Sequence, residues 1–200
     1  IITKAFNFAK QAHKGVKRRS GEPYIMHPIA VAKIVCTEIG LGSTSICSAL
    51  LHDVVEDTDY TVEDIENLFG PKIAQIVDGL TKISGGIFGD RASAQAENFK
   101  KLLLTMSDDI RVILIKIADR LHNMRTMEFM TPAKQKEKSR ETMDIYAPIA
   151  QRLGISKIKT ELDDLSLKYY QPEVYNQLVH DLNARKTERE EFVQQIVAEV

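Results

Sequence analysis

The segment LLHDVVEDTD places a histidine and four carboxylates within eight positions. Four of these side chains share one arc of about 140° on a helix, namely His52, Asp53, Glu56 and Asp57. The simplest interpretation is an amphipathic surface helix with a solvated acidic face. However, Asp53 and Asp57 repel each other at i,i+4, and acids near the carboxyl end of a helix oppose its dipole. These penalties favour a bound cation, with His52 and Asp53 as adjacent metal ligands.

Two other segments supply candidate partners for such a cation. On the helix expected over 109–126, Asp119 continues an apolar stripe into the interior, where a carboxylate must be neutralised, paired or coordinated. Either it forms a salt bridge with Arg120 or Arg125, or it is a second carboxylate ligand. His27 precedes a proline, which places it where a helix starts, with its ring free to point inward. A single histidine is more often a core or surface residue than a ligand, so its candidacy depends on the rest of the set.

Two imidazoles and two carboxylates suit one divalent ion with positions left open for water. The set is His27, His52, Asp53 and Asp119. The absence of thiolates favours a harder ion such as Mn²⁺ over structural zinc, and it leaves Fe²⁺ and catalytic Zn²⁺ open. His13 and His180 are expected to lie too far away to take part, so a two-metal site is not expected.

Helices must position these residues, because apolar residues recur at three- and four-residue spacing along the chain. The expected helices cover 3–13, 29–39, 44–56, 62–68, 71–80, 95–106, 109–126, 134–150, 158–169 and 173–199. Period-two alternation is absent, so the pattern predicts an all-α bundle of roughly ten helices. The helix that carries HDVVED is expected to run unbroken from a cap at Ser43 or Thr44. The segment SGGIFGDRASA is predicted to be a connector and not a phosphate loop, because no strand precedes it and no Gly-Lys-Ser/Thr follows it.

The composition excludes several classes of protein. The chain has 200 residues, of which 44% are apolar and 28% charged, as in ordinary globular domains. The net charge of −1 argues against direct nucleic-acid binding, so any anion site must come from a local cluster. No apolar run is long enough to span a membrane. The two cysteines, Cys36 and Cys47, are expected to be buried thiols, which suits a reducing cytoplasm. Both ends of the chain are expected to be cuts in a longer protein.

Several segments together resemble one family: HKGVKRRSGEPYIMHP, ALLHDVVEDT, VDGLTKI, QAENFKKLLLTMSDDIRVILIKIADRLHNMRT and YAPIAQRLGISKIKTELDDL. They resemble the N-terminal hydrolase domain of the long Rel/SpoT-type enzymes, members of the HD superfamily that make and destroy (p)ppGpp. The resemblance covers almost the whole chain and implies an HD-superfamily helical bundle. It implies an HD hydrolase domain over residues 1–152. Residues 153–200 would form a helical extension leading towards a synthetase domain that is absent from this chain.

The resemblance also assigns roles to the acidic segment. It implies that one Mn²⁺ is bound by His27, His52, Asp53 and Asp119. Glu56 and Asp57, one helical turn beyond the ligands, would orient and deprotonate the attacking water. Alternatively, these two carboxylates support the ligands or cap a solvated helix end. Family members that only synthesise have lost both pairs of residues, so the intact pairs in this sequence favour a working hydrolase.

The segment KGVKRRSGEPY is the candidate for substrate recognition. Its four basic residues within six positions form either a solvated loop or, beside a metal site, an anion funnel for two diphosphates. The resemblance implies that the guanine is framed by Arg18, Arg19, Ser20 and Tyr24. It also implies that Asn123 and Thr126 lie near the ribose and its phosphates.

Together these residues predict a Mn²⁺-dependent guanosine-3′,5′-bis(diphosphate) 3′-pyrophosphohydrolase of the stringent response. It would convert (p)ppGpp to GDP or GTP plus pyrophosphate, next to a C-terminal synthetase domain in the full-length protein. One alternative is an HD phosphohydrolase of another nucleotide, and another is a hydrolytically silent nucleotide-sensing module. A serine hydrolase built on Ser20, His27 and Asp53 is disfavoured, because no nucleophile elbow is present.

Overall fold

The computed structural model describes residues 1–86 and 109–199, and in these ranges the chain forms helices, turns and one isolated bridge between Lys17 and Pro23. The elements are α1 (Ile2–Ala12), α2 (Met26–Ile34), η1 (Val35–Ile39), α3 (Ser43–Leu51), α4 (Val54–Asp57), α5 (Val62–Phe69), α6 (Pro71–Gly86), α8 (Ile110–Arg125), η2 (Met127–Phe129), α9 (Pro132–Glu141), η3 (Thr142–Tyr146), α10 (Ala147–Arg152), α11 (Ser156–Tyr170) and α12 (Pro172–Glu199). The predicted all-α bundle is confirmed. The helix expected over 95–106 and most of the SGGIFGDRASA connector lie outside the described residues.

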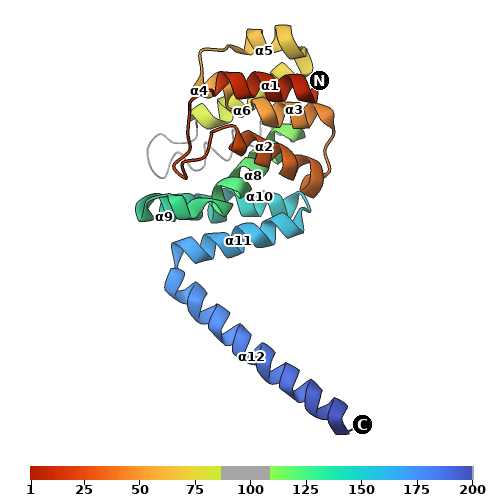
Figure 1. Ribbon diagram of the computed structural model, residues 1–200, viewed down its shortest axis with the longest axis vertical. Coiled ribbons are helices and arrows are strands. Elements are labelled where there is room, and N and C mark those ends of the chain that lie inside the picture. The colour runs from red at the N-terminus through yellow and green to blue at the C-terminus, as the bar shows by residue number, and fades with distance from the viewer. Residues whose placement is uncertain (87–108, 200) are drawn as a thin grey trace.

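Helix α8 runs through the middle of the bundle. It packs against α2, α3, α6 and α11, and in Figure 1 it lies between the α1–α6 group and the α9–α11 group. Ile113 and Ile117 lie on one face of this helix and Ile115 lies on the opposite face, and all three are fully buried. Burial of each such side chain stabilises the fold by about 1.5–3 kcal/mol. A helix that is surrounded by protein in this way holds its polar residues in fixed positions.

The segment SICSALLHDVVED does not form the single helix that its pattern predicts. Helix α3 ends at Leu51, His52 and Asp53 form a turn, and α4 begins at Val54. The His52 ring donates from Nδ1 to the Ala49 carbonyl at 2.7 Å, and in an unbroken helix that carbonyl would accept the Asp53 amide. The break therefore occurs at the two residues of chemical interest.

The start of α3 also differs from the prediction. Its N-cap is Gly42, in extended conformation and without a side-chain bond, so the expected caps at Ser43 and Thr44 are wrong. Gly42 has no side chain to bond the first amides of the helix, so the cap contributes little, and α3 depends on burial of its apolar residues. Of the two cysteines, Cys47 is buried as expected, whereas Cys36 in η1 is exposed.

The last two helices differ in how they contact the bundle. Helix α11 packs against α9 and α10 and places Ile158 and Leu162 in the hydrophobic core. Helix α12 extends away from the bundle in Figure 1, and several of its apolar side chains, including Leu182 and Phe192, are exposed. Within the described ranges, every helix is too short or too polar to cross a membrane.

Candidate metal centre and adjoining pocket

His52 and Asp53 place two ligand-type atoms at one point. Because the Ala49 carbonyl can only accept, the His52 Nδ1 carries the proton in that bond, and Nε2 is left to bind a cation. Nε2 is buried and lies 2.9 Å from Asp53 Oδ2. The same short distance suits a shared proton in the metal-free protein and two neighbouring ligands of one ion.

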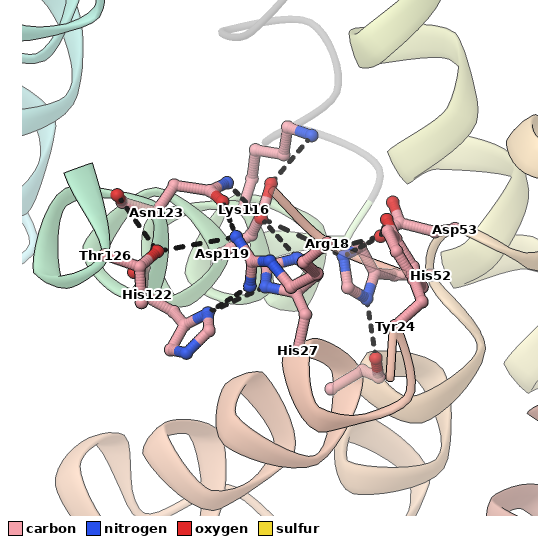
Figure 2. A network of polar contacts seen from close by, with 11 residues as sticks. Arg18, Tyr24, His27, His52, Asp53, Lys116, Asp119, His122, Asn123 and Thr126 are labelled. Carbon is pink, nitrogen blue, oxygen red and sulfur yellow. Dashed lines mark hydrogen bonds and ion pairs between the residues drawn. The ribbon is translucent and has the colours of Figure 1, made fainter. Parts of the chain in front are cut away.

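His27, from the start of α2, and Asp119, from α8, complete the cluster. His27 Nε2 lies 3.7 Å from Asp53 Oδ2 and 3.1 Å from Asp119 Oδ1. His52 Nε2 lies 3.9 Å from the same Asp119 oxygen, so the four atoms form a closed ring of contacts (Figure 2). Ligands that bind an ion at about 2.1 Å lie about 3 Å from each other when adjacent. Three of the four predicted ligands, His27, His52 and Asp53, offer ligand atoms that all lie within 4.8 Å of one another, and the fourth, Asp119, lies beside the two histidines.

The charges of the cluster explain why a cation suits it. Burial opposes protonation of His52, but Asp53 and Asp119 outweigh burial and raise the pKa of His52 to about 9. Burial also works against ionisation of Asp53, yet contact with His52 holds the pKa of that carboxyl well below its usual range. In the metal-free protein a proton on His52 thus compensates the two carboxylates, in the place where a metal ion would do so.

Asp119 is held from its own helix. Asn123 Nδ2 donates to Oδ1 at 2.8 Å, and Lys116 Nζ lies 3.0 Å from Oδ2. Burial alone would raise the pKa of Asp119, but Lys116 and the histidines hold it well below the usual range. The salt bridges considered from the sequence are formed elsewhere, since Arg120 pairs with Glu141 and Arg125 pairs with both Glu38 and Glu161. Lys116 was missed, although its i,i+3 spacing from Asp119 was a usable signal.

Tyr24 contacts the metal cluster directly. Its hydroxyl donates to Asp53 Oδ2 at 2.6 Å, whereas the resemblance placed this residue at the guanine. Burial, followed by the charges of Asp53 and Asp57, raises the pKa of Tyr24 far above its ordinary value. The His13 ring is buried, and its centroid lies 4.6 Å from the centroid of the Tyr24 ring. The expectation that His13 lies far from the site is therefore wrong. The path of the loop after α1 brings it there, and helical spacing carries no signal for that path.

A pocket of about 330 Å³ adjoins the cluster at His27. Its walls include all six residues predicted to bind substrate: Arg18, Arg19, Ser20, Tyr24, Asn123 and Thr126. Phe129, the last residue of η2, and Met130, which follows it, also line the pocket and were not predicted. The basic loop is therefore one wall of a pocket and not a free surface segment.

Arg18 fastens that loop to α8. Its guanidinium donates to Asn123 Oδ1 at 3.1 Å and to Thr126 Oγ1 at 3.4 Å, and Nη1 lies 3.1 Å from His122 Nδ1. His122 Nδ1 also lies 2.7 Å from His27 Nδ1. Burial, with the nearby His27 and Arg18, lowers the pKa of His122 to about 4, so this ring is neutral at pH 7. His122 was not proposed from the sequence, although it shares a face of α8 with Asp119.

Glu56 and Asp57 lie on α4, one turn after the ligands, and both are exposed. Glu56 lines a second cavity of about 220 Å³, which also contacts Lys116 and Asp119. The amide of Asp57 donates to the Asp53 carbonyl at 2.8 Å, which ties α4 to the metal cluster. Neither carboxylate belongs to the ring of ligand atoms, so both remain candidates for proton transfer.

The comparisons with known proteins agree with this geometry. A family model described as HD domain matches residues 5–156. The chain is 50% identical over 199 residues to a GTP pyrophosphokinase of Myxococcus xanthus, covering 97% of this chain and 26% of that protein. It is 46% identical over 199 residues to the bifunctional (p)ppGpp synthase/hydrolase SpoT of Escherichia coli (strain K12), covering 100% of this chain and 28% of that protein.

A solved structure gives the same result. It is described as a metazoan ortholog of SpoT that hydrolyzes ppGpp and plays a role in starvation responses. The two structures match with a TM-score of 0.58 and 26% sequence identity, over 88% of this chain and 94% of the ortholog's chain. The chain spans about a quarter of the length of the curated relatives it matches. The ring of two histidines and two aspartates thus lies inside the matched range, and the chain belongs to the HD domain family, in its Rel/SpoT type.

Proposed function

We propose that this domain is a Mn²⁺-dependent guanosine-3′,5′-bis(diphosphate) 3′-pyrophosphohydrolase that converts (p)ppGpp to GDP or GTP plus pyrophosphate. The observation that carries the proposal is the ring of ligand atoms beside a pocket lined by basic residues. Two relatives, a (p)ppGpp synthase/hydrolase and a ppGpp-hydrolyzing ortholog of SpoT, support the same reaction.

The metal would be held by His27, His52, Asp53 and Asp119. A divalent ion held there would lower the pKa of a water ligand and neutralise charge on phosphoryl oxygens. The all-nitrogen-and-oxygen donor set favours Mn²⁺, since no cysteine belongs to the cluster. The protein itself orients the ligands, through the Ala49 carbonyl behind His52 and the Lys116 ammonium behind Asp119.

Glu56 and Asp57 would accept the proton from the attacking water. Both carboxylates are on α4, and its first residue follows the ligand Asp53 directly. Exposure keeps them open to solvent, so a proton taken from the water can leave to bulk solvent. Glu56 lines the cavity that Asp119 also lines, which supports a role beside the ligands.

The pocket beside His27 would bind the nucleotide. Arg18 is held by its bonds to α8, so the guanidinium is oriented before a ligand arrives. Lys17 and Arg19 add positive charge from the exposed part of the loop, where two diphosphates need compensation. Ser20 and Thr126 add hydroxyl groups that can bond the edges of the base or sugar.

The longer relatives suggest the context of this activity. Because the chain spans about a quarter of their length, we propose that a synthetase domain accompanies it in the full-length protein and that residues 153–200 lead towards that domain. The protein would act in the cytoplasm on a free nucleotide during the stringent response, without direct contact to nucleic acid.

The decisive experiment is incubation of the purified chain with ppGpp and Mn²⁺, with and without a chelator. We expect GDP and pyrophosphate in equal amounts, and no product when the chelator is present. An Asp53→Asn variant should lose turnover, whereas Asp59→Asn, an exposed acid beyond α4, should retain it. Turnover of nucleotides that lack a 3′-diphosphate would instead indicate a general HD phosphohydrolase. Binding of ppGpp without turnover would indicate a sensing module.

A further inference from the structure

The contact between His27 and His122 joins two imidazoles through the same kind of atom. Their Nδ1 atoms are 2.7 Å apart, and the ring centroids are 4.9 Å apart with the planes tilted by 37°. A short contact of this kind requires that one nitrogen donates a proton and that the other accepts it. The two rings alone do not decide which does which.

Arg18 decides the direction of that bond. Its Nη1 lies 3.1 Å from the same His122 Nδ1, and a guanidinium has donors only. His122 Nδ1 must therefore be the acceptor for Arg18, so it carries no proton of its own. In the contact between the two rings, His27 Nδ1 must then be the donor. The proton between the two histidines belongs to His27 Nδ1.

This assignment has a consequence at the other nitrogen of His27. With the proton on Nδ1, Nε2 is the atom that can bind a metal, and Nε2 is the atom that lies 3.1 Å from Asp119 Oδ1 and 3.7 Å from Asp53 Oδ2. His52 reaches the same state through a backbone carbonyl, that of Ala49. His27 depends instead on a side chain, so its orientation is open to mutation and to changes in the pocket.

We propose that His122 is a positioning residue, which holds His27 in the tautomer that binds metal and ties that ligand to the Arg18 wall of the pocket. The inference rests on the proposed function for the identity of the metal. His122 does not line either cavity described above, and it acts on the metal site only through His27. Arg18 in turn keeps His122 in the accepting state.

Two substitutions of His122 distinguish its role as a hydrogen-bond acceptor from a role in packing alone. His122→Leu removes the acceptor and keeps most of the volume. His122→Asn retains an oxygen close to the position of Nδ1, so it should restore the bond from His27. His180→Leu is the matched control, because His180 is exposed on α12 and contacts only Asp181 among the described interactions.

The measurements are Mn²⁺ affinity by titration calorimetry at fixed pH, and ¹H–¹⁵N spectra of imidazole-labelled, metal-free protein. We expect His122→Leu to bind Mn²⁺ about 10- to 100-fold more weakly, His122→Asn to recover most of the affinity, and His180→Leu to match the wild type. The wild-type spectrum should show a proton on Nδ1 of His27 and none on Nδ1 of His122. Circular dichroism checks that each variant is folded.

Unchanged affinity in a folded His122→Leu, or no recovery in His122→Asn, would overturn the proposal. A protonated Nδ1 on His122 in the wild-type spectrum would overturn it without any variant. Failure of the proposed function gives a different result, since wild-type protein would then bind Mn²⁺ poorly or leave ppGpp intact. The metal-free spectrum still decides the His27–His122 bond in that case.

Discussion

Lys116 Nζ lies 3.0 Å from Asp119 Oδ2, on the opposite side of the carboxylate from the oxygen that faces His27. Oδ2 of Asp119 therefore pairs with a cation of the protein, whereas Oδ1 accepts from Asn123 Nδ2 and faces the candidate metal cluster. Figure 2 shows Lys116 and His27 on either side of Asp119. Such an arrangement leaves one oxygen of Asp119 for a metal and compensates the charge of the other.

Lys116→Met should destabilise the metal-free protein by about 3 kcal/mol, because it leaves a buried carboxylate without its closest cation. Added Mn²⁺ should restore part of the loss, since a ligand that binds only the folded state stabilises it. Denaturant titrations with and without Mn²⁺ measure both effects. Lys82→Met is the control, because Lys82 forms an exposed pair with Asp78 on α6 and should cost at most about 0.5 kcal/mol. Equal effects of the two substitutions would contradict the role given to Lys116.

Tyr24→Phe tests whether Tyr24 orients a ligand or binds the base. Loss of the hydroxyl removes a hydrogen bond to a charged oxygen, worth about 1.5–3 kcal/mol. We expect weaker Mn²⁺ binding in the absence of any nucleotide, measured by calorimetry. Tyr60→Phe, at an exposed tyrosine that packs on Phe8, should leave the affinity unchanged. If Tyr24→Phe alters only the KM for ppGpp, the bond to Asp53 has no part in metal binding.

Glu56→Gln and Asp57→Asn should lower kcat by about 10²- to 10⁴-fold if the residue changed is the proton acceptor. Neither carboxylate is in the ligand ring, so Mn²⁺ affinity should stay close to that of the wild type. Steady-state hydrolysis of ppGpp together with calorimetry separates the two quantities. A parallel loss of metal binding and turnover would assign these residues to support of the ligands instead.

Asp109 makes a pH-dependent contribution to stability at the start of α8. Bonds from Arg111, and a contact with Lys72, hold the pKa of Asp109 below its usual range. Because the folded-state value is lower than the unfolded value of about 3.9, the stabilisation is present at neutral pH and is lost as the pH falls below about 4. Asp109→Asn should lower the free energy of unfolding by about 1 kcal/mol at pH 7.

The difference between wild type and Asp109→Asn should shrink at pH 3, because the unfolded wild-type chain then binds a proton at Asp109 that the folded state does not, and this lowers the wild-type stability. Urea titrations at the two pH values measure it. Asn can still accept the Arg111 amide, so the helix cap is retained and only the charge is tested. A difference that does not change with pH would contradict the assignment.

Truncations test how much of the chain the bundle needs. A chain that ends at Tyr170 lacks α12 and should keep the full free energy of unfolding, because α12 extends away from the bundle. A chain that ends at Arg152 loses the buried Ile158 and Leu162 and should be less stable by about 3–6 kcal/mol. Denaturant unfolding of both chains gives the answer. Equal stability of the two would place α11 outside the folded unit.

Helical spacing was enough to predict the bundle and the neighbours on each helix. The face of α8 that holds Asp119 and Asn123 follows from a period of 3.6 residues. The same reasoning failed at the junction of α3 and α4, because the bond from the His52 ring to the Ala49 carbonyl competes with the helix and no propensity describes it.

Contacts between distant segments were decided only by tertiary structure. Tyr24 reaches Asp53 across 29 positions, and Arg18 and His27 reach His122 across 104 and 95 positions. These partners meet because the loop after α1 folds back along α8 and α2 packs beside it, and such packing is not encoded in the spacing within any one helix. The sequence therefore specifies which residue types can bind a metal, while packing selects the residues that orient them.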